Sequence, residues 1–164
     1  MDQNKVLYAL ENRCLYLKMI GSIRHTVCTN LDSIVRQVID QDQVDQFVVD
    51  LRSAVFLDST SLGIIARMAR YMKKSSEKPV LISTNDDVNE ILNSIRFNSI
   101  AQIVKGSEYF PEKLFDSDLY TEQIRPHHDI ILESHHELTK IHKNNKNKFD
   151  AVIKSLENDQ DKKD

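Results

Sequence analysis

Runs of apolar residues in the first third of the chain predict two strands, a helix and a further strand. The runs 6–10 and 14–20 are separated by a polar break at 11–13, which is typical of a β-hairpin. Apolar residues then recur at helical spacing over 31–39, with polar residues on the other face. The run 47–51 is apolar at nearly every position, which favours a strand covered on both faces, as in a sheet with parallel neighbours.

The alternation of helices and strands continues to residue 106. Helical spacing over 60–74 and 86–96 alternates with apolar runs at 79–83 and 100–104. The predicted order is therefore β-β-α-β-α-β-α-β, and strands joined through helices need right-handed crossovers. We expect an α/β fold with a mixed sheet and helices packed mainly on one side. The second helix is expected to turn its basic residues toward water: Arg67, Arg70, Lys73 and Lys74.

The character of the sequence changes after residue 106. Residues 107–126 are too apolar for a free tail and too irregular for a strand, so we expect them to dock on the domain. Residues 127–158 show helical periodicity, interrupted at 144–147 by asparagines, which leaves one helix or two shorter ones open. Their apolar stripe has to be buried against the domain, a second copy of the chain or a partner.

These changes divide the chain into three segments. We predict one domain at 1–106, a docking segment and amphipathic helical extension at 107–158, and a disordered tail at 159–164. The length of 164 residues suits one globular domain of about 100–150 residues with such an extension. A homodimer formed through the C-terminal helices stays open.

The polar turn between the run 47–51 and the second helix carries the candidate chemistry. Asp58 is followed there by three hydroxyl residues, Ser59, Thr60 and Ser61. The first backbone N–H groups of a helix have no partner inside it, and the helix dipole favours negative charge at that end. A hydroxyl at this position is therefore a natural place to add or remove a phosphate.

Each residue of the turn also has a structural explanation. Asp58 or Ser59 can cap the helix by accepting hydrogen bonds from its free backbone N–H groups. Thr60 and Ser61 are favoured as residues of the turn or first helical turn over phosphate acceptors. Gly63 is expected to let the helix pack closely against a strand.

Composition removes several functional classes. The net charge is −3 with Lys and Arg scattered, so no nucleic-acid partner is expected. The sequence has neither an apolar run of about 18 residues nor a signal-peptide pattern, so we expect no membrane association. The two cysteines, Cys14 and Cys28, fit a reduced protein of the cytoplasm. With three glycines there is no glycine-rich phosphate loop, and we expect no cofactor.

Three histidines in the C-terminal part are candidate metal ligands. His128, His135 and His142 are seven residues apart and share one helical face. Metal-binding pairs on a helix use a spacing of about three or four residues, so we expect no metal site. Neither cysteine has a catalytic arrangement, and no triad can be argued from residue order. The chain is therefore not expected to be an enzyme.

The turn and its flanking elements resemble a known family. The strand 48–51, the sequence Leu-Asp-Ser-Thr-Ser-Leu-Gly at 57–63 and the following helix are similar to the signature of STAS domains, in particular bacterial anti-sigma factor antagonists. The resemblance covers roughly 5–106. In the family the serine directly after the aspartate is the phosphate acceptor, which implies Ser59 here. The tail resembles the helical extension of a proteobacterial branch tied to motility and biofilm control.

The resemblance implies a partner-switching cycle in transcription regulation. The unphosphorylated chain would bind an anti-sigma factor or a related regulator, and a serine kinase of the anti-sigma type would release it by phosphorylating Ser59. A metal-dependent serine phosphatase would restore binding. The alternative is a STAS scaffold or a ligand-sensing module of a cytoplasmic signalling complex, without a phospho-switch. The implied partner-binding residues are Asp58, Ser59, Thr60, Ser61 and Leu62.

Overall fold

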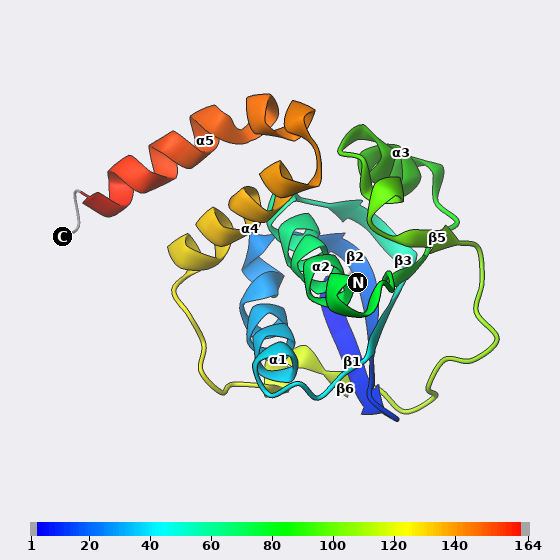
Figure 1. Ribbon diagram of the computed structural model, residues 1–164. Helices are drawn as coiled ribbons and strands as arrows, with labels where there is room; N and C mark the ends of the chain where they lie inside the picture. Colours follow the sequence, from blue (N-terminus) through cyan, green and yellow to red (C-terminus); the bar gives the residue numbers. More distant parts are fainter. Residues whose placement is uncertain (1–2, 162–164) are drawn as a thin grey trace.

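A six-stranded mixed sheet lies at the centre of the computed structural model, which describes residues 3–161 (Figure 1). Its strands are β1 (Lys5–Glu11), β2 (Cys14–Ile23), β3 (Gln46–Leu57), β4 (Val80–Ile82), β5 (Gln102–Val104) and β6 (Phe115–Asp116). The α-helices are α1 (Cys28–Asp40), α2 (Ser59–Met72), α3 (Asp86–Ser94), α4 (His127–Ile141) and α5 (Lys143–Asp161). Short 3₁₀ turns are η1 (His25–Val27), η2 (Lys73–Ser75), η3 (Phe97–Ser99) and η4 (Ser117–Leu119).

The strand pairing confirms the predicted fold class. The order across the sheet is β5-β4-β3-β2-β1-β6, with β2 to β5 parallel and β1 antiparallel to both of its neighbours. Asn12 and Arg13 join β1 to β2, and both have positive φ, at 50° and 60°. Two such residues make the tight turn whose twist suits a hairpin. The exposed Arg13 side chain donates hydrogen bonds to the carboxylate of Asp45, just before β3, and so links this turn to the next strand.

The two-residue strand β6 was not expected. Residues 115 and 116 pair with Leu7 and Tyr8 of β1, so the expectation that 107–126 holds no strand is wrong for them. Pairing over two residues at a sheet edge leaves no periodic signal in the sequence, which is why the pattern misses it. The rings of Tyr8 and Phe115, 5.9 Å apart, add a cross-strand contact.

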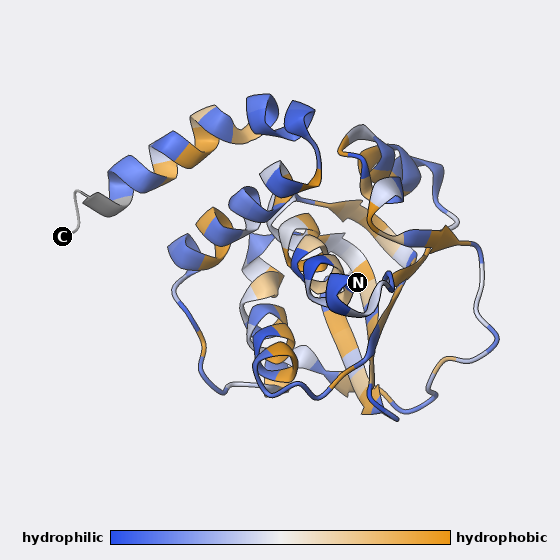
Figure 2. Cartoon of the chain, in the orientation of Figure 1, coloured by the Kyte–Doolittle hydropathy of each residue, from blue (hydrophilic) through white to orange (hydrophobic). Residues whose placement is uncertain are grey.

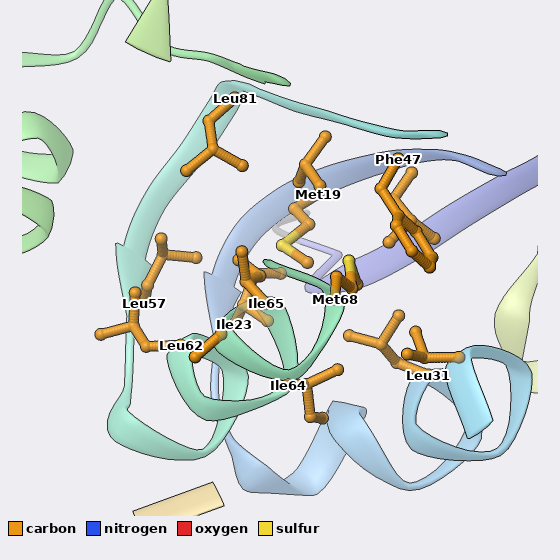
Figure 3. Packing of buried hydrophobic residues seen from close by; sticks show 14 of the residues in the cluster. Met19, Ile23, Leu31, Phe47, Leu57, Leu62, Ile64, Ile65, Met68 and Leu81 are labelled. Atoms are coloured by element: carbon orange, nitrogen blue, oxygen red, sulfur yellow. The ribbon is translucent and has the colours of Figure 1, made fainter. Parts of the chain in front are cut away.

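The main core fills the space between the sheet and the two helices α1 and α2. Figure 3 shows Met19 and Ile23 of β2 and Phe47 of β3 meeting Leu31 of α1 and Met68 of α2. All five side chains are fully buried. Figure 2 shows the same arrangement as a sheet of mostly apolar strands beneath helices whose outer surfaces are polar. This core holds the end of β3 and the start of α2 in a fixed relation.

Helix α2 is buried on both sides. A helix on the surface of a domain normally buries one stripe, but every residue from 60 to 69 is buried here. The reason is α4, which packs on the outer face of α2 (Figure 1). Arg67 is only 7% exposed, so the expectation that it faces water is wrong. The C-terminal helices therefore pack on the domain.

The extension forms two helices. Helix α4 ends at Ile141 and α5 begins at Lys143, so the chain breaks at His142, just before the asparagines. Helix α5 packs on α4 and projects from the body of the domain (Figure 1). The expected disordered tail at 159–164 falls in part on residues 162–164, outside the described residues. Residues 159–161 form the end of α5.

A network of charged side chains joins α1, α2 and α4. The carboxylate of Asp32 accepts hydrogen bonds from Arg67, at 3.2 Å, and from Arg125, at 2.6 Å. Glu133 of α4 accepts from Arg67 at 3.2 Å. Burial opposes the charged form of Asp32, but the hydrogen bond from Arg125 and the charge of Arg67 outweigh it and lower the pKa of this carboxyl. The same two arginines outweigh burial at Glu133 and lower its pKa.

The lowered pKa values predict a loss of stability in acid. A carboxyl whose pKa is lower in the folded state stabilises the fold at pH values above its unfolded pKa, about 4, and this contribution disappears as the pH falls through the folded value. We expect the free energy of unfolding, measured in urea, to fall below pH about 4. Asp32→Asn should cost about 3 kcal/mol at neutral pH, because Arg36, Arg67 and Arg125 lose their buried partner, and should make stability less dependent on pH in acid.

The exposed ion pair of Arg13 and Asp45 provides a matched control. Asp45→Asn removes the same charge from a side chain that is 72% exposed, so its effect should stay within about 1 kcal/mol. Equal losses for Asp32→Asn and Asp45→Asn would contradict the importance assigned to the buried network.

Candidate functional site at the start of helix α2

Asp58 is the residue that caps α2. Its backbone is extended, and its Oδ1 accepts a hydrogen bond from the backbone N–H of Ser61 at 2.9 Å. Its other oxygen accepts from the backbone N–H of His25 at 2.6 Å. Asp58 therefore satisfies one free N–H of the helix and also ties the junction of β3 and α2 to the turn after β2. Since Asp58 is the cap, the Ser59 hydroxyl is not needed for capping.

The three hydroxyls of the turn lie in different environments. Ser59 is half-buried, whereas Thr60 is 3% exposed and Ser61 fully buried. The Ser61 hydroxyl donates to the Asp58 carbonyl at 2.8 Å. Leu62 belongs to the core cluster. The structure thus brings Asp58 and Ser59 to the surface, and it places the other three candidate residues inside.

The Ser59 hydroxyl contacts a histidine from the C-terminal extension. Its Oγ lies 2.9 Å from Nε2 of His135 in α4. The other ring nitrogen, Nδ1, lies 2.7 Å from the carbonyl oxygen of Ile131. A carbonyl can only accept, so Nδ1 carries the proton, and in the neutral ring Nε2 accepts from Ser59. His135 is 6% exposed and its ring packs edge-on against Phe149 of α5.

This histidine could not be found from the sequence. His135 follows Ser59 by 76 residues, and its spacing suggested only a shared face with His128 and His142. Those two histidines have other contacts: Nε2 of His128 lies 2.6 Å from the Leu156 carbonyl, and His142 stands at the break between α4 and α5. Within residues 3–161, no group of three or more His, Cys, Asp or Glu side chains is placed to hold a metal ion.

Helices α2 and α4 touch through their backbones at Gly63. A Cβ atom at this position would lie 2.3 Å from the Ser134 carbonyl oxygen and 2.4 Å from the Ser134 Cα atom, closer than atoms can approach. Gly63 thus permits a close approach, but between two helices and not between helix and strand as expected. Two turns further on, Arg70 donates hydrogen bonds through Nε and Nη2 to the carboxylate of Glu137 in α4. Glu137 is only 3% exposed.

The part of the chain up to β5 is similar to a known family and to solved structures. The STAS domain family model matches residues 7–109, so α4 and α5 lie beyond the match. The anti-sigma factor antagonist SpoIIAA in its unphosphorylated form aligns with a TM-score of 0.52 and 14% identity, over 66% of this chain and 91% of that one. An anti-sigma factor antagonist from Mycobacterium paratuberculosis aligns with a TM-score of 0.55 and 16% identity, over 64% and 88%.

A third solved structure is similar to the same part of the chain. The Bacillus cell fate determinant SpoIIAA in its phosphorylated form aligns with a TM-score of 0.51 and 13% identity, over 66% of this chain and 93% of that one. At these identities the likeness concerns the fold alone. No curated protein matches the chain. In residues 3–161, no helix is both long enough and apolar enough to cross a membrane.

The division of roles between Asp58 and Ser59 can be tested by stability. Asp58→Ala removes the cap and the bond to His25, so it should lower the free energy of unfolding by about 1–2 kcal/mol. Asp58→Asn keeps an accepting oxygen and should cost less. Ser59→Ala loses one hydrogen bond and should cost about 1 kcal/mol or less. If Ser59→Ala were the more damaging change in urea unfolding, the cap would be misassigned.

Proposed function

The chain belongs to the STAS domain family, and we propose that it is an anti-sigma factor antagonist that switches partners through phosphorylation of Ser59. The unphosphorylated chain binds an anti-sigma factor or a related regulator with serine kinase activity. Phosphorylation releases this partner, and a metal-dependent serine phosphatase restores binding. The chain acts as a cytoplasmic binding module in signal transduction and catalyses no reaction itself. Control of motility or biofilm formation is its proposed output.

The exposure of the hydroxyls around Asp58 is the observation that carries this proposal. Ser59 is half-buried, but Thr60 and Ser61 are both buried, so a kinase that approaches from solvent meets Ser59 first. The free N–H groups of α2 favour an anion at this position. The solved structures of SpoIIAA in phosphorylated and unphosphorylated forms, which share this fold, add support.

A phosphate on Ser59 would act mainly on the bound partner. It adds roughly 1.5 to 2 negative charges and three strong acceptor oxygens. The N-terminus of α2 favours this charge, whereas the neighbouring Asp58 opposes it. A partner docked over Ser59 would have to bury the dianion, and an unpaired buried charge costs several kcal/mol. This cost corresponds to a fall in affinity of about a hundredfold or more.

The first test is to locate the phosphate. The full chain is purified from its own cells with phosphatase inhibitors and mapped by mass spectrometry. We expect the phosphate on Ser59, because Thr60 and Ser61 are buried, and we expect a metal-dependent serine phosphatase to remove it. A phosphate found only at another residue would refute the assignment of Ser59.

The second test is to measure binding. Ser59→Asp should weaken capture of the partner from cell extract by about a hundredfold, and Ser59→Ala should keep the partner even with kinase and ATP present. Ser75→Asp is the matched control, since it adds the same charge to an exposed serine at the far end of α2. Loss of the partner from Ser59→Ala on adding kinase and ATP would rule out the switch and favour a scaffold without one.

A further inference from the structure

Helix α4 covers the outer face of α2 (Figure 1). The contacts between the two helices begin at Ser59, the first residue of α2. One turn of α4, residues 133–137, contacts residues spread over three turns of α2. Ser59, the proposed phosphorylation site, lies at one end of this face. The contacts run along α2 in the order Ser59 with His135, Gly63 with Ser134, Arg67 with Glu133, and Arg70 with Glu137.

We propose that α4 is an intramolecular cover, which competes with the kinase and the partner for this face of α2. Release of the C-terminal helices from α2 is then the step that frees the half-buried Ser59 hydroxyl from His135 and completes its exposure to a kinase. The inference rests on the proposed role of Ser59 for its biological meaning. The cover itself rests only on the contacts described.

The Ser59 hydroxyl is engaged while α4 is docked. It donates to Nε2 of His135, so its proton and one side of its oxygen face α4 and not solvent. A kinase has to align this oxygen with ATP, which requires the bond to His135 to break. A phosphate on Oγ replaces the proton that Ser59 donates to Nε2, so this hydrogen bond to α4 is lost. Docked α4 and phosphorylated Ser59 therefore oppose each other, and by linkage each weakens the other.

The α2 side of the contact with α4 has little apolar surface to expose. On α2 it includes the small residues Gly63, Ala66 and Ala69 together with the charged Arg67 and Arg70. Small side chains expose little apolar surface when a neighbouring helix leaves, and arginines are readily solvated. The ion pairs with Glu133 and Glu137 fix where α4 sits more than how tightly it is held.

Two side chains anchor α4 more firmly. Ile130 is 2% exposed and Leu138 fully buried, and both belong to the core cluster. Release of α4 therefore requires these two side chains to leave the core. This makes the closed form the resting state and explains why release needs a partner, a kinase or a change in the contact itself.

Access to position 59 can be measured without a kinase or a partner. Ser59→Cys places a thiol at the site, and the rate of its reaction with a small maleimide reports access. The native thiols of Cys14 and Cys28 are buried, which raises the pKa of both and keeps them protonated. The chain without the substitution gives the background rate.

Two substitutions are designed to weaken the contact between α2 and α4, one on each helix. Gly63→Ala puts a methyl group into the Ser134 backbone while improving the helix propensity of α2. Glu137→Lys puts a positive charge against Arg70. Two control substitutions make the same chemical changes away from α4. Gly106→Ala adds a methyl group where there is open space, and Glu90→Lys reverses a charge at an exposed position of α3.

We expect each loosening change, combined with Ser59→Cys, to raise the maleimide rate by about tenfold or more, and each control to leave it unchanged. Hydrogen exchange on the same proteins should show lost protection in α4 and retained protection in β2 and β3. If α4 stays as protected as these strands in both variants, it is an integral part of the fold and the proposal fails. If α4 loses protection but the maleimide rate does not rise, α4 does not cover the site.

The phosphate-mapping experiment is independent of this result. The maleimide reaction needs no kinase. It therefore shows whether α4 covers position 59 even if the phosphate is found at another residue. Where a kinase is in hand, Gly63→Ala should also be phosphorylated faster than Gly106→Ala by about the same factor.

Discussion

The burial of α2 between the sheet and α4 is the constraint on which the rest of the structure depends. On its inner side α2 contributes Ile64, Ile65 and Met68 to the core. On its outer side it presents Gly63 to the backbone of α4. A helix in this position can neither shift nor rotate without losing one of the two contacts. The orientation of its first residues, Asp58 and Ser59, is fixed as a consequence.

Electrostatic pairing reinforces the same constraint. Arg67 lies on α2 and reaches Asp32 on α1 and Glu133 on α4, so one side chain joins three helices. Buried ion pairs of this kind add little net stability, because each charge has lost its water. These ion pairs do disfavour any other packing of the helices that would leave a buried charge without a partner. The network therefore specifies the packing of the helices more than it strengthens it.

The sequence predicts the order of strands and helices up to residue 106, because each element there has an apolar face with its own period. The site is predicted in part for the same reason: Asp58 and Ser59 follow a buried strand directly. The contact with His135 could not be predicted, since it joins residues 76 positions apart. The burial of Arg67 was missed because its partners lie on two other helices. Local patterns record which face of a helix is apolar, but they do not record which polar groups will meet.

Residues 120–126, the short connection between η4 and α4, keep α4 close to α2. This closeness determines how strongly another protein must bind to replace α4 on α2. A helix held on so short a tether acts at an effective concentration of about a millimolar or more, whatever the amount of protein present. Dilution cannot open such a chain, and higher expression cannot close it. A protein that binds the same face of α2 has to displace α4 against this effective concentration. A protein that binds weakly therefore leaves α4 in place, and only one that binds tightly displaces it.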